Sequence, residues 1–201
     1  MSQRHLHPVA PPSPLQMGDL SDDDLMLLVQ SGHAHAFEVL IRRHQSYVLG
    51  LASRFLADAA VGRDIAQEVF LSIWSNASHY EARGRFRSYL LSMTLKRCQH
   101  LGRAHRSQLR KRESQVLHQE GDSAAQGTPL EALIERERAR AVRERLAELP
   151  EKARAVVILR FTNGLSLAEI AEVTGAPAGT VKSHLFRALR QLQRLLGKEV
   201  P

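Results

Sequence analysis

The chain has 201 residues, with 28 Lys and Arg against 21 Asp and Glu, and a formal net charge of +7. That length suits one or two small domains and excludes a large multidomain enzyme, while the basic excess predicts a polyanionic partner, either nucleic acid or a membrane surface. The single cysteine, Cys98, excludes an internal disulfide framework and fits a reducing cytosol; no apolar run reaches transmembrane length, and the amino terminus lacks a signal-peptide core.

The apolar pattern predicts an all-α fold of two small helical domains joined by a flexible linker, because aromatic residues are few and alternating β-branched runs are absent. Residues 1–18, with prolines at 8, 11, 12 and 14, are expected to be a disordered tail. Residues 19–103 are assigned to the first domain, 104–127 to the linker and 128–198 to the second domain. His5 and His7 form an H-x-H pair in the tail, where two solvated histidines are the simpler interpretation.

Three helices are expected in the first part of the first domain. Ser21 can cap the first of them, and Gly32 is expected to close it. The second runs from about residue 36 to near residue 58, and Val61 and Gly62 are expected to break the chain before a third helix at 63–75.

The helix at 63–75 has two different faces. Its apolar stripe, which is expected to face the core, contains Ile65, Ala66, Val69, Phe70, Ile73 and Trp74. The opposite stripe contains Asp64, Gln67, Glu68 and Leu71. On residue chemistry alone this second stripe is an ordinary solvated side with one exposed leucine.

Residues 76–85 predict a loop with Tyr80 as an aromatic group, followed by a helix from about residue 86 to 102. The expected core face of that helix contains Phe86, Tyr89, Leu90, Met93 and Leu101. Another face brings together Lys96, Gln99, His100 and Arg103. Between Lys96 and Arg112 there are seven Lys or Arg and no acid, a density that favours a phosphate backbone as partner. Cys98 and His100 alone do not make a zinc site.

The second domain is expected to open with a capping box at Thr128, Pro129 and Glu131. Its first helix ends before Pro150, which starts a second helix that ends at the pair 163–164, Asn-Gly. The predicted domain is four helices around a small core.

The last two helices predict a helix-turn-helix. Ser166 and Glu169 form an S-x-x-E capping box, Gly175 supplies the turn, and Pro177 suits the first turn of the next helix. That helix places Val181, Leu185, Ala188, Leu189 and Leu192 on its apolar face. Its other face carries Lys182, Ser183, Phe186, Arg187 and Arg190, with no acid between Lys182 and Lys198. A helix face that offers cations to phosphates and other side chains to base edges predicts DNA binding in the major groove.

Three motifs together carry a family resemblance: DIAQEVFLSIW at 64–74, FRSYLLSM at 86–93, and LPEKARAVVILRFTNGLSLAEIAEVTGAPAGTVKSHLFRALRQL at 149–192. In this order and spacing they resemble the bacterial sigma-70 family, in its extracytoplasmic-function group. The resemblance covers residues 19–198 apart from the linker. It implies sigma domain 2 at 19–103 and sigma domain 4 at 128–198.

The resemblance also implies roles for the stripes and loops described above. The β′ clamp helices of core RNA polymerase would be bound by Asp64, Gln67, Glu68 and Leu71. This role replaces the simpler interpretation of that stripe as an ordinary solvated side. The −10 element would be bound and melted by Tyr80, Arg85, Lys96, Gln99, His100 and Arg103. The helix-turn-helix at 167–186 would read the −35 element, with Thr180, Lys182, Ser183, His184, Phe186, Arg187 and Arg190 as its DNA-binding residues. The implied partners are core polymerase (β′ clamp helices and β flap), promoter DNA and an anti-sigma factor; no catalytic residue, cofactor, metal or membrane insertion is implied, and the expected location is the cytoplasm.

Five positions depart from the family's usual residues. Lys96 and His100 stand where this group commonly has asparagine and aspartate, so −10 preference could differ. His184 replaces a usual arginine and Phe186 a usual histidine; Phe186 could touch a thymine methyl or pack on its own domain. Tyr89 also occupies a place where the family usually has a buried tryptophan.

Three other interpretations compete with a sigma factor. A conventional helix-turn-helix regulator would bind duplex DNA tightly without polymerase and would not need the stripe at 64–74. A metal sensor would use the ten histidines and Cys98, which form no four-ligand pattern. An enzyme lacks support, because no nucleophile–base motif, glycine-rich phosphate loop or H-E-x-x-H occurs.

Overall fold

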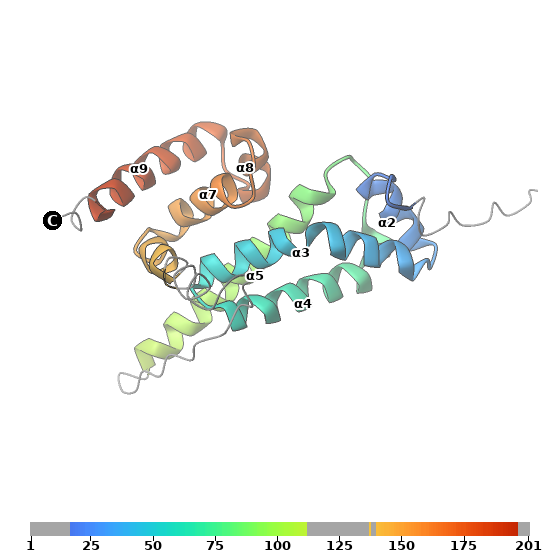
Figure 1. Cartoon of the computed structure of the whole chain (residues 1–201), viewed down its shortest axis with the longest axis horizontal. Helices are drawn as coiled ribbons and strands as arrows, with labels where there is room; N and C mark the ends of the chain where they lie inside the picture. Colours follow the sequence, from blue (N-terminus) through green and yellow to red (C-terminus); the bar gives the residue numbers. More distant parts are fainter. Residues whose placement is uncertain (1–16, 112–136, 138–139, 197–201) are drawn as a thin grey trace, which may run out of the picture.

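A computed structural model describes residues 17–111, 137 and 140–196 of the chain (Figure 1). The first domain contains α2 (Asp22–Gln30), α3 (Ala34–Leu56), α4 (Ala59–Ser75), the short 3-10 helix η1 (Ala77–His79) and α5 (Phe86–Lys111). The second contains a helix at 140–147, α7 (Glu151–Phe161), α8 (Leu167–Thr174) and α9 (Ala178–Leu196). No strand occurs in these described ranges, and the all-α prediction is confirmed.

Several predicted features lie outside the described residues. They are the histidine pair at 5 and 7, the capping box at 128–131, and most of the predicted linker. Within the described ranges, no helix is both long and apolar enough to cross a membrane.

The first domain is built around α3, which packs against α2, α4 and α5. Leu40, Val48 and Leu51 of α3 are fully buried and form the centre of the core. Full burial of each such side chain contributes about 1.5–3 kcal/mol. The start of α2 is fixed to α3 by Asp22, whose carboxylate lies 2.9 Å from Arg43 Nη1 and 2.7 Å from His44 Nε2.

The expected break at Val61 and Gly62 is wrong. α4 begins at Ala59, where the Asp58 carboxylate accepts hydrogen bonds from the Ala60 and Val61 amides, and Gly62 lies inside the helix. A Cβ added at Gly62 would stand 2.8 Å from the Ser53 amide nitrogen of α3, and closer still to the Ser53 hydroxyl. Gly62 therefore allows α3 and α4 to approach closely, and its role is packing rather than chain termination.

α5 differs from the sequence prediction in length and in register. It continues to Lys111, beyond the expected end near residue 102. Tyr89 and Leu101, which were expected in the core, are each 37% exposed, while Leu91, Leu95 and Cys98 are buried. The buried stripe thus follows Leu90, Leu91, Leu95 and Cys98, a helical face displaced by a fraction of a turn from the predicted one.

The helix-turn-helix forms as predicted. The Ser166 amide donates to Glu169 Oε2 at 2.7 Å and the Glu169 amide donates to Ser166 Oγ at 3.2 Å, which completes the capping box of α8. The hydrogen bonds that the side chain and the backbone amide of Ser166 make to its carboxylate lower the pKa of Glu169. Gly175 ends α8 with φ +66°, a left-handed conformation that glycine adopts without a Cβ clash.

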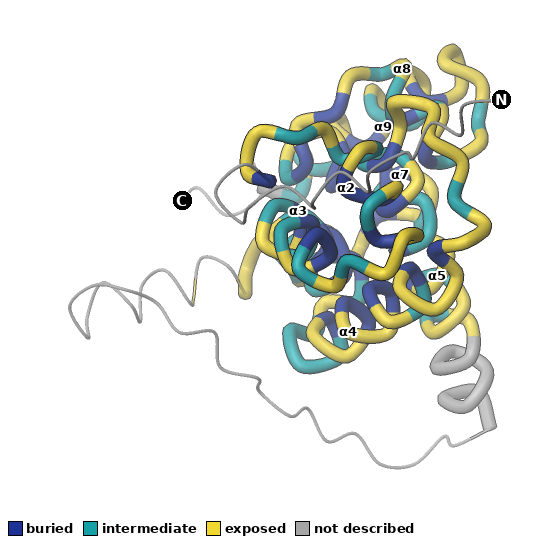
Figure 2. The backbone as a smooth tube through the Cα atoms, turned by 90° about the vertical axis from the view of Figure 1, so that its right-hand side faces the viewer, coloured by how far each residue is buried: buried dark blue, intermediate teal, exposed yellow. Residues whose placement is uncertain are grey.

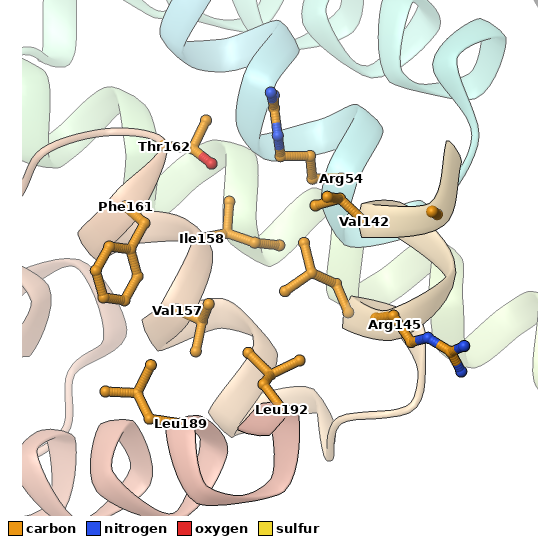
Figure 3. Close-up of a pocket in the computed structure, with 11 residues that line it drawn as sticks. Arg54, Val142, Arg145, Val157, Ile158, Phe161, Thr162, Leu189 and Leu192 are labelled. Carbon is orange, nitrogen blue, oxygen red and sulfur yellow. The ribbon is translucent and has the colours of Figure 1, made fainter. Parts of the chain in front are cut away.

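A cavity of about 300 Å³ lies where the second domain meets α3 (Figure 3). Its lining is apolar and includes Val142, Ile158, Leu189 and Leu192, with Arg54 of α3 at its edge. Phe161 of α7 also lines it and is 64% exposed.

Candidate nucleic-acid interface

The second helix of the helix-turn-helix presents its basic face to solvent. Val181 and Ala188 bury the opposite face of α9. The predicted DNA-binding residues Thr180, Lys182, Ser183, Phe186, Arg187 and Arg190 are all exposed, and His184 is half-buried. None of the ion pairs within the described ranges involves Lys182, Arg187 or Arg190, so their charges are available to phosphates.

Phe186 lies outside the core of its own domain. Its side chain is 59% exposed, and the Arg190 guanidinium lies 5.1 Å from the centroid of its ring. This cation–π contact holds an aromatic ring and a cation side by side on the surface of α9. Phe186 is therefore not a member of the domain core, and most of its ring is open to solvent.

The outer face of α4 consists of Asp64, Gln67, Glu68 and Leu71. All four are exposed, and they share one side of the helix because they follow one another at i, i+3, i+4 and i+7. Figure 2 shows α4 at the edge of the molecule, with buried and exposed residues alternating along it. Trp74, predicted to be in the core, is 41% exposed although its ring lies 5.1 Å from that of Phe37.

The basic side of α5 meets the outer face of α4 at a cavity of about 380 Å³. Lys96 and His100, one helical turn apart, line this cavity together with Glu68 and Arg97. Arg97 Nε lies 2.5 Å from Glu68 Oε2, and both side chains are about half exposed, at 51% and 48%. Sequence reasoning missed this link because the position of Arg97 over α4 depends on how the two helices pack.

The six residues predicted for −10 recognition fall into two groups. Lys96, Gln99, His100 and Arg103 share the middle of α5, where Gln99 is half-buried and the other three are exposed. Tyr80 and Arg85 lie before the start of α5, and the helix rises about 26 Å between residues 86 and 103. Arg85 is paired with Glu172 of α8, at 3.3 Å between Nη1 and Oε1.

The loop at 76–85 is fastened to α2. Tyr80 Oη donates to Asp23 Oδ1 at 2.6 Å, and the Gly84 amide donates to the other carboxylate oxygen of Asp23. The Gln30 side chain donates to the carbonyls of Ala77 and Tyr80, at 2.9 and 2.8 Å. Asp23 is thus a site residue that sequence reasoning missed, since three successive aspartates at a helix start suggest only a favourable interaction with the helix dipole.

The two tyrosines beside this loop differ in how they are held. Tyr80 is half-buried, its ring lies 5.4 Å from that of Tyr89 and 5.7 Å from that of Phe86, and burial together with the Asp23 hydrogen bond raises its pKa. Tyr89 is more exposed, and burial raises its pKa as well. Tyr89 therefore presents more of its ring to solvent, while Tyr80 anchors the loop to α2.

Cys98 is fully buried in α5, and burial raises its pKa to about 12. At neutral pH it is a protonated thiol packed in the core, an environment that suppresses thiol reactivity. His100, two residues on, is exposed. Cys98 and His100 therefore face different surroundings: the thiol faces the core and the imidazole faces solvent.

Comparison with known proteins places these surfaces in one family. Residues 40–108 match the family model of sigma-70 region 2, and residues 139–192 match that of sigma-70, region 4. The RNA polymerase sigma-H factor of Pseudomonas aeruginosa is 30% identical over 182 residues, covering 87% of this chain and 93% of the relative. The ECF RNA polymerase sigma-E factor of Haemophilus influenzae is 27% identical over 181 residues, covering 87% and 94%.

A solved structure has the same fold. It is the sigma factor RpoE in complex with the anti-sigma factor NepR from Bartonella quintana, with a TM-score of 0.65 and 18% identity, covering 82% of this chain and 98% of that one. The two region matches fall on the two described domains, and the similarity to the sigma-H factor extends over most of both chains. The chain therefore belongs to the sigma-70 family of RNA polymerase sigma factors, in the extracytoplasmic-function group.

Proposed function

We propose that this sigma factor performs promoter-specific initiation through three surfaces: the outer face of α4 for core polymerase, the loop at 76–85 with the basic side of α5 for the −10 element, and α9 for the −35 element. As a sigma factor the chain binds core RNA polymerase and directs promoter recognition, melting and initiation. It acts in the cytoplasm as a dissociable subunit without catalytic residues. One observation carries the proposal. The first domain exposes both the outer face of α4 and the basic side of α5, and the second domain exposes the basic face of α9.

The outer face of α4 suits a basic, partly apolar helical partner. Asp64 and Glu68 supply negative charge along the face that ends at Leu71, which is 56% exposed. In a specific interface, burial of an apolar residue supplies affinity, and neighbouring charges supply orientation and on-rate. The clamp helices of the polymerase β′ subunit are the proposed partner.

Melting of the −10 element requires binding energy rather than chemistry. A base that leaves the duplex can stack on an aromatic side chain, which contributes about 1–3 kcal/mol per base. Tyr89 offers such a ring, while Lys96, His100 and Arg103 line the path of the backbone along α5. Because Lys96 and His100 replace the usual asparagine and aspartate, we expect base preference at −10 to differ from that of typical relatives.

The −35 element is proposed to meet the exposed face of α9. Lys182, Arg187 and Arg190 contact phosphates or guanine edges, and the Phe186 ring contacts a thymine methyl. Further contacts with the polymerase β flap and with an anti-sigma factor follow from the family. The relative RpoE binds the anti-sigma factor NepR, which supports a partner of this class here.

The test of the polymerase surface is a charge reversal on α4. Asp64→Lys is expected to weaken binding to purified core polymerase at least tenfold, because it places a cation against a basic partner. The matched control is Glu38→Lys on α3, an exposed acid that belongs to none of the three proposed surfaces. Binding is measured by fluorescence anisotropy of labelled chain, and unfolding by circular dichroism. Normal binding of Asp64→Lys to core polymerase would show that α4 is not the contact.

A further inference from the structure

One carboxylate of α2 holds both ends of a short segment in the loop at 76–85. Asp23 Oδ1 accepts a hydrogen bond from the Tyr80 hydroxyl at 2.6 Å, and the other carboxylate oxygen of Asp23 accepts one from the Gly84 amide. The three residues between these two donors, 81–83, are all exposed. Figure 1 shows the same loop passing beside α2 on its way from α4 to α5. A single side chain therefore joins the two ends of the exposed segment 81–83.

Core packing does not fix the segment 81–83, because its three residues face solvent. Glu81 and Arg83 form an ion pair with each other, and Gly84 has a φ of +68°, a left-handed conformation that glycine adopts without a Cβ clash. Within the described residues, every side-chain hydrogen bond that joins residues 80–84 to another element leads to α2. The shape of the segment thus depends on its polar contacts with α2.

α2 is itself fixed to the core of the first domain through the neighbouring aspartate. The Asp22 carboxylate lies 2.9 Å from Arg43 Nη1 and 2.7 Å from His44 Nε2, and both partners belong to α3. His44 is buried, and Arg43 also donates to the Leu20 carbonyl at 2.8 Å. Asp22 joins α2 to α3, while Asp23 joins α2 to the loop. The position of the loop is therefore set by the core through α2.

The loop also places an aromatic ring at the start of α5. The Tyr80 ring lies 5.4 Å from that of Tyr89 and 5.7 Å from that of Phe86. The Tyr80 hydroxyl is the group that Asp23 holds, so the same hydrogen bond fixes the ring. A binding surface is most effective when hydrogen bonds hold its side chains within about 0.5 Å of the required geometry before the ligand arrives. Asp23 therefore controls the surroundings of Tyr89, on which a melted base is proposed to stack.

We propose that Asp23 is a positioning residue for melting of the −10 element: its carboxylate preorganises Tyr80 and the segment 81–83, so that a base leaving the duplex meets a surface already in place. Asp23 itself does not contact DNA. Without its two hydrogen bonds the loop is ordered only when the base arrives, and the conformational entropy lost then reduces the binding free energy that opens the duplex. The inference rests on the proposed function of the loop and of α5 in −10 recognition.

The charge of Asp23 distinguishes this role from a purely electrostatic one. A carboxylate near a phosphate backbone repels it, so on charge alone the removal of Asp23 would strengthen promoter binding, most of all at low salt. A positioning role predicts the opposite sign, because loss of the carboxylate weakens promoter opening. Asp24 offers a matched comparison: it is exposed, it is the next residue of α2, and its hydrogen bonds stay within the cap at Ser21.

The test compares Asp23→Asn with Asp24→Asn, each bound to core polymerase. Asparagine keeps the shape of aspartate but has one acceptor oxygen in place of two, so it cannot hold both Tyr80 and Gly84. The template is the strongest promoter that run-off transcription finds for the wild-type chain, used as a duplex and with mismatched, already open base pairs at −10. Permanganate reactivity of thymines measures opening of the duplex, and the yield of abortive transcripts measures initiation on both templates.

We expect Asp23→Asn to open the duplex promoter at least about fivefold less than the wild type, and to initiate within about twofold of it on the pre-opened template, where no base pair has to be broken. Asp24→Asn should remain within about twofold of the wild type on both templates. Normal duplex opening by Asp23→Asn, or an equal loss on both templates, would overturn the positioning role. A wild-type chain that adds no start site to core polymerase would instead contradict the proposed function.

A second measurement uses the free chain and needs no promoter. Hydrogen exchange followed by mass spectrometry should show faster amide exchange across residues 80–85 in Asp23→Asn than in the wild type, with exchange in α3 and α4 unchanged. Tyr80→Phe removes only the hydroxyl. In duplex opening, the double variant should stay within about twofold of Asp23→Asn, because both changes break the same hydrogen bond. Effects that multiply, or loop exchange identical to that of the wild type, would contradict the link from Asp23 to Tyr80.

Discussion

Single residues couple the proposed polymerase surface to the proposed DNA surface. Glu68 belongs to the outer face of α4, yet it pairs with Arg97, which lines the cavity beside Lys96 and His100. Both side chains are about half exposed, so the pair contributes little to stability, on the order of 0–1 kcal/mol. A cation of the polymerase can therefore displace Arg97 from Glu68 at a small cost in free energy. The Arg97 guanidinium is then free to contact DNA.

Arg97→Ala tests this exchange. We expect the free energy of unfolding to change by less than about 1 kcal/mol, because the pair is exposed. The salt dependence of promoter-complex formation with core polymerase should lose about one unit of slope, as one phosphate contact disappears. Urea unfolding and filter binding at several salt concentrations measure the two effects, with Arg42→Ala of α3 as control. An unchanged slope would exclude Arg97 from DNA binding.

Asp22 predicts a pH dependence of stability. Burial works to raise its pKa, but the hydrogen bonds from His44 and Arg43 outweigh burial and lower it. Since the folded pKa lies below the unfolded one, the contribution of this carboxylate is complete above the unfolded pKa, near 3.8, and is lost as the pH falls through the folded pKa. The difference in unfolding free energy between wild type and Asp22→Asn should shrink below about pH 4. A pH-independent difference in urea unfolding would contradict this.

At the scale of elements, we expect alanine to have opposite effects on stability at two glycines that lie inside helices. Gly62→Ala should destabilise the first domain by about 1–3 kcal/mol, because the new Cβ would meet the backbone of Ser53. Gly102→Ala in α5 is the matched control: nothing lies within 4 Å of its added Cβ, so alanine should stabilise the helix by about 0.5–1 kcal/mol. Thermal unfolding of both variants measures the difference. Equal effects would mean that α3 and α4 are not in close contact at Gly62.

Elements with local signals could be predicted from the sequence, and elements decided by packing could not. The capping box of Ser166 and Glu169, the turn at Gly175 and the exposed α4 stripe depend on near neighbours in the chain, and all three are present. The register of α5 and the role of Gly62 depend on contacts between distant helices. Tyr89 consequently looked like a core residue and Gly62 like a helix breaker.

At the scale of the whole molecule, the contact between the two domains had no signal in the sequence. Asn163 precedes a glycine and therefore indicated only a turn. Its burial arises because α7 and α8 pack on α3 and α5, an arrangement that joins residues 47 and 163 across the two domains. The family of the chain, by contrast, was evident from three local motifs, because each of them folds into a surface within one domain.

We predict that neither the −10 surface nor the −35 surface suffices alone for promoter recognition. The chain should add promoter specificity to core polymerase, and by itself it should bind duplex DNA weakly, because each proposed DNA surface holds only one promoter element. A conventional helix-turn-helix regulator would behave in the opposite way, binding its operator tightly and adding no new start sites.

The measurement that tests this most directly is run-off transcription on fragmented genomic DNA with core polymerase, followed by sequencing of the transcripts. We expect discrete start sites that appear only when the chain is added, with shared sequences upstream near −10 and −35. Start sites identical to those of core polymerase alone, together with tight duplex binding by the free chain, would contradict the account.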